Sequence, residues 1–292
     1  MTVIDLINES AARLEQAGVA FGHGTANAFD EAAWLVLWKL GHPLDQIDEH
    51  ADEAVPRDQQ AGVEVLVAQR IATRKPAAYL TQEAWLQGVA FYVDERAIVP
   101  RSFIAEIIAD GDIDYWLGEH TRSVLDLCTG NGSLAVLAAM CWPDVSVAAA
   151  DISPKALEVA RINVDKHALA ARIALIHSDG FKGVRGSFDL ILCNPPYVSA
   201  QSMSQLPAEY QAEPALALAG GADGMDFIRG LLADAPAHMT EHAVLVLEIG
   251  NERTNFEATF PRLPAVWLET SAGDDQVLLL TREALLTLSS RP

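Results

Sequence analysis

Apolar residues recur at helical spacing throughout the first quarter of the chain. In VIDLINESAARLEQAG they fall near one stripe of a helix that Gly18 would end. The segment DEAAWLVLWKLGHP repeats the pattern, and EVLVAQRIATRKP predicts a third helix that ends near Pro76. We therefore expect a small helical domain over residues 1–76.

The pattern changes to shorter runs after this helical part. AWLQGVAFYVDERAIVP has β-type residues on both sides of Gln87-Gly88, which predicts a β-hairpin in a linker over residues 77–100. From Ser123 onward, strand-like and helix-like runs alternate, as is typical of a parallel sheet with crossover helices. AVWLET and QVLLLT predict a pair of strands at the sheet edge. We expect an α/β domain over residues 101–292.

Composition and charge narrow the class of protein. The 292 residues are half apolar, and no apolar run approaches the ~18 residues of a membrane span. The first residues lack the features of a secretory signal, and the three cysteines do not have metal-site spacing. These features predict a cytoplasmic protein with reduced thiols, no metal and no membrane contact. The net charge of −20 argues against binding to a nucleic-acid backbone. It is compatible either with a basic protein partner or with a charge that only keeps the protein soluble.

A glycine-containing turn joins a predicted strand to a helix in VLDLCTGNGSLAVLA. Gly130 and Gly132 would let the backbone turn sharply and approach a ligand closely. A nicotinamide enzyme would carry a third glycine where this chain has Ala135. Asp126 would repel a pyrophosphate and would favour a cationic ammonium or sulfonium group.

Three further predicted strands end in polar residues. Asp151 follows Asp126 at the distance typical of an acid that binds ribose hydroxyls, although it could also cap the next helix, as could Ser153. Asp179 could reach an adenine amino group or could simply belong to a turn. Asn194 ends the fourth strand. Because the carboxyl ends of parallel strands meet at one edge of a sheet, these residues predict a single site.

The motifs DLCTGNG, Asp151, SDGF and NPPY, in this order, resemble the Rossmann-like methyltransferases that use S-adenosylmethionine. The NPPY tetrapeptide is similar to that of enzymes that methylate a planar amino or amide nitrogen. The helical leader, the hairpin and IVPRSFIAEII resemble the protein glutamine methyltransferases. VPRS and the long segment after NPPY look most like the branch that modifies the third large-subunit ribosomal protein. The release-factor branch tends to carry PRPDTE where this chain has PRSFIAE.

The resemblance implies a seven-stranded Rossmann-like methyltransferase domain and a set of site residues. It implies that S-adenosylmethionine, which becomes S-adenosylhomocysteine, is bound by Asp126, Cys128, Thr129, Gly130, Asn131, Gly132, Asp151, Ile152, Asp179, Gly180, Phe181 and Asn194. It implies a protein substrate at Arg101, Glu106, Asn194, Pro195, Pro196 and Tyr197, with Asn194, Pro195 and Tyr197 catalytic. Two residues depart from the family pattern: Phe103 stands where proline is usual, and Gly180 stands where the release-factor branch has tryptophan. Adenine would then be covered by Phe181 or not at all.

The tetrapeptide suits the chemistry of a glutamine amide. The amide nitrogen is a poor nucleophile because its lone pair is delocalised into the carbonyl. If the Asn194 side-chain oxygen and the Pro195 carbonyl each accept one N–H, the nitrogen is oriented and becomes more electron-rich. Tyr197 can lay its ring on the planar amide, and the prolines keep the acceptors rigid. The alternative is an ordinary proline turn.

Several alternatives remain at this point. Arg101 could contact cofactor or substrate or could pair with an acid, Glu106 could face the amino group of the cofactor, and Glu248 could be structural. We expect the helical domain to recognise a basic ribosomal protein, and a peptide-chain release factor is the alternative substrate. A DNA amino-methyltransferase would need a basic surface. A non-catalytic assembly factor would not need Asn194 and Asp126.

Overall fold

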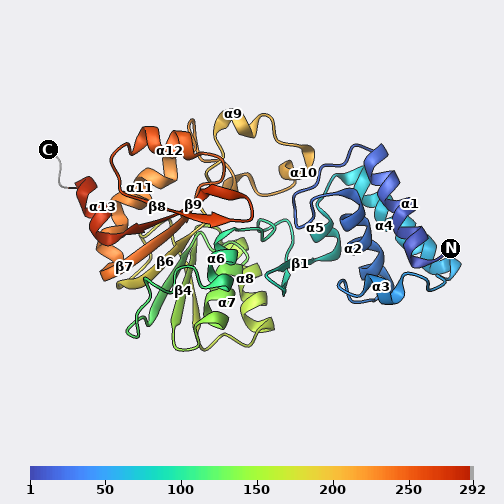
Figure 1. The fold of residues 1–292 in the computed structure, drawn as a ribbon, viewed down its shortest axis with the longest axis horizontal. Coiled ribbons are helices and arrows are strands. Elements are labelled where there is room, and N and C mark those ends of the chain that lie inside the picture. The colour runs from blue at the N-terminus through green and yellow to red at the C-terminus, as the bar shows by residue number, and fades with distance from the viewer. Residues whose placement is uncertain (290–292) are drawn as a thin grey trace.

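The computed structural model describes residues 1–289 and has two lobes that lie side by side along the long axis of the molecule (Figure 1). The smaller lobe is helical. It contains α1 (Val3–Gln16), α2 (Ala28–Leu40), α3 (Ile47–His50), α4 (Arg57–Thr73) and α5 (Ala77–Thr81). Its core is formed by buried residues such as Leu6, Trp34 and Val63.

The helices begin and end where their sequences favour it. Thr2 caps α1 by accepting from the Asp5 N–H, and the Asp5 carboxylate accepts from the Thr2 N–H in return. Gly41, with φ of 77°, ends α2 in the left-handed conformation that glycine adopts easily. The predicted helices are present, but the third begins at Arg57 rather than at Glu64.

A two-stranded hairpin follows the helical lobe. It consists of β1 (Glu83–Leu86) and β2 (Val89–Tyr92), which pair antiparallel with Leu86 opposite Val89. Gln87 and Gly88 form the turn with φ of 49° and 72°. Positive φ at both central residues is the geometry that fits a two-residue hairpin. The predicted turn is confirmed, although helix α5 occupies the first residues of the expected linker.

The larger lobe is built on a seven-stranded sheet in the order β5-β4-β3-β6-β7-β9-β8. The first five of these strands are parallel, and β9 and β8 run antiparallel at one edge. The expected sheet and its terminal strand pair are therefore confirmed. The strands are β3 (Ser123–Leu127), β4 (Ser146–Asp151), β5 (Ile173–His177), β6 (Phe188–Cys193), β7 (Met239–Glu248), β8 (Val266–Thr270) and β9 (Gly273–Thr281).

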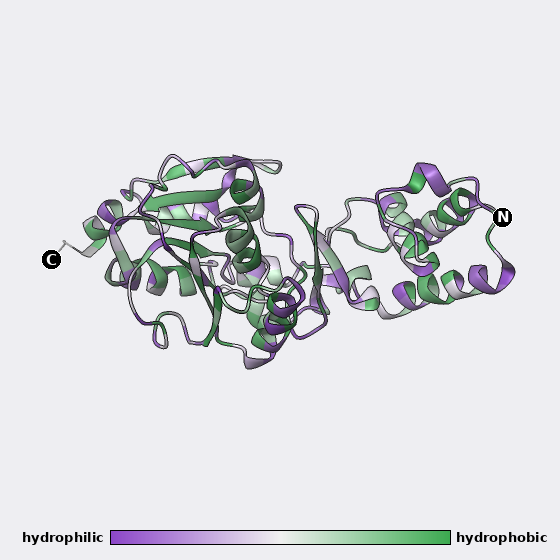
Figure 2. Ribbon diagram, turned by 90° about the horizontal axis from the view of Figure 1, so that it is seen from below, coloured by the Kyte–Doolittle hydropathy of each residue, from purple (hydrophilic) through white to green (hydrophobic). Residues whose placement is uncertain are grey.

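Helices cover both faces of this sheet because its strands are apolar on both sides (Figure 2). Along β3, Val124 packs into the core beneath α6 and α7, whereas Leu125 packs into the core beneath α11 and α13. The helices of this lobe are α6 (Ile104–Asp110), α7 (Ser133–Cys141), α8 (Pro154–Lys166), α9 (Ala200–Met203), α10 (Ala208–Gln211), η1 (Ala215–Ala217), α11 (Asp226–Asp234), η2 (Ala235–His238), α12 (Arg253–Thr259) and α13 (Arg282–Ser289). Across residues 1–289, none of the helices is both long enough and apolar enough to span a membrane.

Candidate active site

The strand order reverses between β3 and β6, and a cavity of about 900 Å³ opens at the carboxyl ends of these strands. Such a reversal is where open α/β sheets bind ligands. Most of the residues expected from the sequence line this cavity. They are Arg101, Glu106, Cys128, Thr129, Gly130, Asn131, Asp151, Ile152, Asp179, Gly180, Asn194, Pro195, Pro196 and Tyr197.

The loop from Cys128 to Gly132 forms one wall of the cavity. Cys128, Gly130 and Gly132 have φ of 64°, 56° and 83°, so the backbone turns sharply before α7 begins. A Cβ atom at Gly132 would lie 3.1 Å from the Cβ of Ala160 on α8. Gly132 is not among the cavity-lining residues, so its role is to let the loop approach α8 closely.

Asp126 lies behind this loop and does not line the cavity, which corrects the expectation that it meets a cationic group directly. Its Oδ2 accepts from the Thr129 hydroxyl and from the Ala135 N–H at 3.0 Å, so the carboxylate fixes the loop. Burial raises the pKa of Asp126 to about 7. Its Oδ1 and the Asn131 Nδ2 are buried and have no hydrogen-bond partner among residues 1–289. Of these two residues only Asn131 lines the cavity, so its side-chain amide is the group that a polar ligand at this wall can reach.

Asp151 connects the loop to the start of α8. Its Oδ2 accepts from the Gly130 N–H at 2.9 Å, and its Oδ1 accepts from the Ser153 N–H at 2.8 Å. Ser153, rather than Asp151, caps α8 by accepting from the Ala156 N–H. Burial raises the pKa of Asp151. The carboxylate therefore lies in the cavity wall at the end of β4, where an acid can accept from ribose hydroxyls.

The segment after β5 only partly follows the expectation. Asp179 and Gly180 line the cavity, and the exposed Asp179 carboxylate pairs with Lys182 at 2.5 Å. Phe181 does not line the cavity. Its ring is buried in the core and stacks on His238 with a centroid distance of 4.5 Å, so the expectation that it covers adenine is corrected. The turn directs this side chain into the core beneath the sheet edge.

Residues 194–197, the NPPY segment, follow directly after β6 in the cavity wall. Within residues 1–289 the side-chain amide of Asn194 has no hydrogen-bond partner, so its oxygen and its NH₂ are free to meet a ligand. Tyr197 is held tightly. Its hydroxyl donates to Glu248 Oε1 at 3.3 Å, and a Cβ atom at Gly250 would lie 2.5 Å from its ring.

Glu248, which the sequence left open as a structural residue, lies in the cavity wall beside Tyr197. It is buried at the end of β7 and lines the cavity. Its Oε2 accepts from the Ser102 hydroxyl at 2.5 Å and from the Phe103 N–H at 2.9 Å, while Oε1 accepts from Tyr197. Burial raises its pKa. The signal that could have identified it is the one used for β3, β4, β5 and β6: a polar residue at the carboxyl end of a strand.

Arg101 pairs with an acid, which was one of the two interpretations of its sequence position. Its guanidinium donates two hydrogen bonds to Glu213, at 2.6 Å to Oε1 and 2.7 Å to Oε2. Glu213 is buried and lies on the segment that follows the NPPY segment. The guanidinium still lines the cavity, but this carboxylate neutralises its charge.

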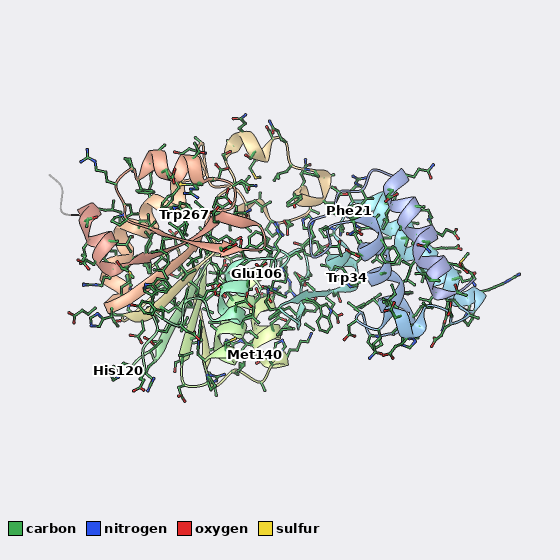
Figure 3. All side chains as sticks on the ribbon, in the orientation of Figure 1. Phe21, Trp34, Glu106, His120, Met140 and Trp267 are labelled. Atoms are coloured by element: carbon green, nitrogen blue, oxygen red, sulfur yellow. The ribbon has the colours of Figure 1, made fainter. Side chains whose placement is uncertain are left out.

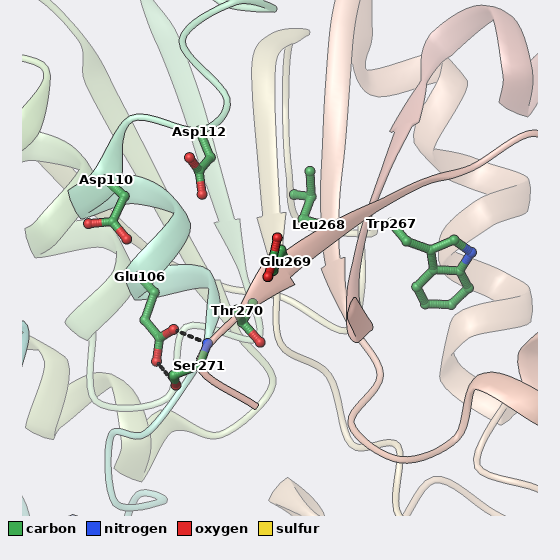
Figure 4. A pocket seen from close by; sticks show the side chains of 8 residues that line it. All are labelled: Glu106, Asp110, Asp112, Trp267, Leu268, Glu269, Thr270 and Ser271. Atoms are coloured by element: carbon green, nitrogen blue, oxygen red, sulfur yellow. Dashed lines mark hydrogen bonds between the residues drawn. The ribbon is translucent and has the colours of Figure 1, made fainter. Parts of the chain in front are cut away.

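Glu106 lies on α6 of the larger lobe and lines the cavity (Figure 3). Its carboxylate accepts from the Ser271 N–H at 2.8 Å and from the Ser271 hydroxyl at 2.7 Å (Figure 4). Both residues also border a second pocket of about 520 Å³ beside Asp110 and Glu269. The contact with Ser271 fixes the turn between β8 and β9 against α6.

Other parts of the cavity wall were not predicted. Residues 22–26 of the helical lobe contribute Gly22, Gly24, Thr25 and Ala26 to the wall. The hairpin contributes Trp85, and η1 contributes Leu216, and these two large apolar side chains are 46% and 58% exposed. Exposed apolar residues at the rim of a cavity are typical of a binding surface.

One possible set of metal ligands comes together in the helical lobe, from residues that are close in the sequence. Ligand atoms of His42, His50 and Glu53 lie within 4.8 Å of one another. The two imidazole rings are stacked, with centroids 3.9 Å apart and planes inclined by 20°. Because lone pairs lie in the ring planes, nearly parallel rings do not direct them to a common point. Both rings instead face the Glu53 carboxylate.

Comparisons with known proteins agree with this geometry. A family model described as the methyltransferase small domain matches residues 114–216. The chain is 51% identical over 288 residues to the ribosomal protein uL3 glutamine methyltransferase of Burkholderia pseudomallei, covering 96% of this chain and 94% of that relative. It is 44% identical over 285 residues to the protein of the same name from Bradyrhizobium diazoefficiens, covering 95% and 89%.

A solved structure is similar in fold. The catalytic domain of hMettl16, in complex with a MAT2A 3'UTR hairpin, matches with a TM-score of 0.52 and 13% identity, covering 77% of this chain and 81% of that one. At this identity the likeness concerns the fold alone.

Proposed function

Because this chain belongs to the family of ribosomal protein uL3 glutamine methyltransferases, we propose that it methylates a glutamine side chain of uL3 in this cavity. The chain is a protein-glutamine N-methyltransferase that uses S-adenosylmethionine. When bound, S-adenosylmethionine supplies a methyl group on a positively charged sulfur. The task of the protein is then to hold this donor and to orient a weakly nucleophilic amide.

The cavity wall formed by β3 and β4 fits the donor. Asp126 holds the loop from behind, Asn131 presents a side-chain Nδ2 that has no partner among residues 1–289, and Asp151 offers a carboxylate to ribose hydroxyls. The Gly130 turn brings backbone close to the ligand. Exposed Ile152 and Gly180 provide apolar contact for the base, in place of the buried Phe181.

The NPPY segment fits the acceptor. We assign the Asn194 side-chain oxygen and the Pro195 carbonyl as acceptors for the two N–H bonds of the glutamine amide. Tyr197 supplies a ring that Glu248 and Gly250 hold in place. The single observation that carries this proposal is the side-chain amide of Asn194, which lies in the cavity wall with no partner in residues 1–289, beside a fixed tyrosine.

The identity of the substrate is supported by the printed names of the relatives and by charge. A chain of net charge −20 would attract a basic ribosomal protein, and this charge does not favour binding to nucleic acid. A ribosomal substrate also supports the cytoplasmic location expected from the sequence. A release factor carrying an accessible glutamine is the competing substrate of the same chemistry.

Substitution of Asn194 tests the mechanism. Asn194→Ala removes the acceptor, and Asn194→Asp places a negative charge that stabilises the cationic donor before the reaction more than in the transition state. We expect both variants to bind S-adenosylmethionine and to lose at least about tenfold in single-turnover rate, which corresponds to ~1.4 kcal/mol.

Asn8 on the exposed surface of α1 offers matched controls, because Asn8→Ala and Asn8→Asp make the same changes far from the cavity. Near-normal rates in both Asn194 variants would show that the NPPY segment is only a turn. Mass spectrometry of wild-type reactions with purified uL3 and with a release factor decides the substrate, and methylation of the release factor alone would overturn the uL3 assignment.

A further inference from the structure

Residues 198–218, the bridging segment, connect the NPPY segment to the helical lobe. The segment contains α9, α10 and η1, and α10 lies against the helical lobe (Figure 1). It carries two carboxylates, Glu209 and Glu213, whose side chains are fully buried. A buried carboxylate is costly unless hydrogen bonds and opposite charges compensate it, so each deserves a structural reason.

Glu213 joins three segments that are distant in the sequence. It accepts from the Val99 N–H at 2.9 Å and from both terminal nitrogens of Arg101. His23 of the helical lobe lies with its Nε2 3.4 Å from Glu213 Oε2, and its side chain is 1% exposed. Arg101 lowers the pKa of Glu213 to about 2, against the effect of burial, so the carboxylate is ionised at neutral pH.

Tyr210 packs into the same cluster. The centroid of its ring lies 4.3 Å from that of His23 and 5.4 Å from the Arg101 guanidinium carbon. A Cβ atom at Gly22 would lie 2.6 Å from the Tyr210 hydroxyl oxygen, so only glycine fits there without a shift. Gly22, Arg101 and Tyr210 all line the cavity. Glu213 therefore lies behind a part of the wall to which three segments contribute.

Glu209 lies on α10, four residues before Glu213, and provides a contrast. It pairs with Arg70 at 3.2 Å and Arg74 at 2.8 Å, and it accepts from the Ala20 N–H at 3.2 Å. None of these partners lines the cavity. The Glu209 contacts hold the lobes together, whereas the Glu213 contacts also fix a cavity wall.

We propose that Glu213 is a positioning residue for methyl transfer, which holds Arg101, Tyr210 and residues 22–26 as one wall of the substrate side of the cavity. This inference rests on the proposed function, because it concerns how the same cavity receives the protein substrate. It gives the helical lobe a direct part in the active site. This part of the wall is complete only when both lobes are joined through Glu213.

The test compares Glu213→Gln with Glu209→Gln in the full-length protein. Each variant removes one buried charge from the bridging segment, but only Glu213→Gln frees Arg101. We expect Glu213→Gln to lower kcat/KM for uL3 at least about tenfold. The Kd for S-adenosylmethionine is expected to stay within about twofold of the wild-type value. Glu209→Gln is expected to lower Tm while keeping kcat/KM within about threefold.

Arg101→Lys provides a second variant that remains informative if Glu213→Gln does not fold. Lysine keeps the charge but lacks the fork that binds both carboxylate oxygens, so the same selective loss of kcat/KM is expected. Glu213→Asp keeps the charge on a shorter side chain and is expected to recover part of the activity lost in Glu213→Gln.

Two results would overturn the inference. One is wild-type kcat/KM in both Glu213→Gln and Arg101→Lys, and the other is an equal loss of kcat/KM in Glu213→Gln and Glu209→Gln at a temperature where both are folded. Failure of the proposed function gives a different result, namely a wild-type protein that binds S-adenosylmethionine and methylates neither uL3 nor a release factor.

Discussion

The three acids at the ends of β3, β4 and β5 differ most in how much water reaches them. Asp126 is buried, Asp151 is partly buried and Asp179 is exposed. Their partners differ accordingly: backbone and hydroxyl donors for the first two, and a lysine for the third. One residue type therefore fixes a loop from behind, lines the cavity and forms a surface ion pair within the same edge of the sheet.

Asp151→Ala tests the ligand-binding acid. Loss of charge-assisted hydrogen bonds to ribose hydroxyls is expected to weaken S-adenosylmethionine binding by about 1.5–3 kcal/mol. Isothermal titration calorimetry measures the affinity, and the exposed Asp144→Ala, before the other end of β4, is the control. An unchanged affinity in a folded Asp151→Ala variant would contradict the assignment.

Asp126 predicts a pH dependence of stability. Its folded pKa of about 7 lies above its ordinary value of 3.8 because the side chain is buried. Between these values the folded state keeps a proton that the unfolded state has lost. The stabilisation is therefore full below about pH 4 and is lost as the pH rises to about 7.

Urea unfolding of wild type and Asp126→Asn at several pH values isolates this group, because all other acids are common to both. The free energy of unfolding of wild type minus that of the variant is expected to fall from pH 4 to 7, by at most ~1.4 kcal/mol per pH unit, and then to level off. A difference that does not depend on pH would show that Asp126 has an ordinary pKa.

At the scale of elements, the turn after β7 and the segment after β6 depend on each other. Gly250 has φ of 52° and leaves room for the Tyr197 ring, while Gly224 leaves room for the Tyr197 carbonyl. The strand ends themselves are fixed by the parallel pairing of β6 with β7. Loops after neighbouring strands thus hold Tyr197 in place, one at its ring and the other at its carbonyl.

Gly250→Ala is expected to displace this ring, because the new Cβ would lie 2.5 Å from Tyr197 Cε2. We expect kcat to fall at least about tenfold, while the affinity for S-adenosylmethionine changes much less. Gly186→Ala is the matched control, since it has φ of 89° but no atom within 4 Å of the new Cβ. It carries only the backbone cost, ~1–2 kcal/mol of stability. Equal kcat values in the two variants would count against a positioned Tyr197.

Elements with regular apolar spacing were predictable from the sequence, and those without it were not. The strand β6 and the helix α2 have continuous or periodic apolar residues, so their existence and type were evident. The first turn of α4 is polar, so its start at Arg57 left no pattern. Helix α3 has no buried residue and was missed for the same reason.

For the site, the acids and Asn194 were predictable because parallel strands bring their carboxyl ends to one edge. Glu213 and His23 were not, because an ion pair between distant segments leaves no spacing in the sequence. The direction of the Phe181 side chain could not be predicted from the SDGF motif either, because the turn after Asp179 decides whether the ring faces the cavity or the core.

At the scale of the whole molecule, the net charge of −20 and a basic substrate predict electrostatic steering. Between ionic strengths of about 0.01 M and 0.15 M the screening length falls from ~30 Å to ~8 Å. We expect kcat/KM for uL3 to fall at least about tenfold over this range, with kcat nearly constant. Steady-state kinetics at several salt concentrations measure this, and a salt-independent kcat/KM would show that overall charge does not guide the encounter.

The contacts of Glu209 also have a consequence for how the chain folds during synthesis. Its partners Arg70 and Ala20 precede it by 139 and 189 residues. At about 5–20 residues per second, the helical lobe leaves the ribosome on the order of ten seconds before Glu209 is made. In that interval Glu31 is the one ion-pair partner of Arg70, among residues 1–289, that has already been made, and Tyr210 is missing beside residues 22–26. The enzyme therefore becomes competent late in its own translation. The interval is set by the number of residues that lie between the helical lobe and Glu209 in the sequence.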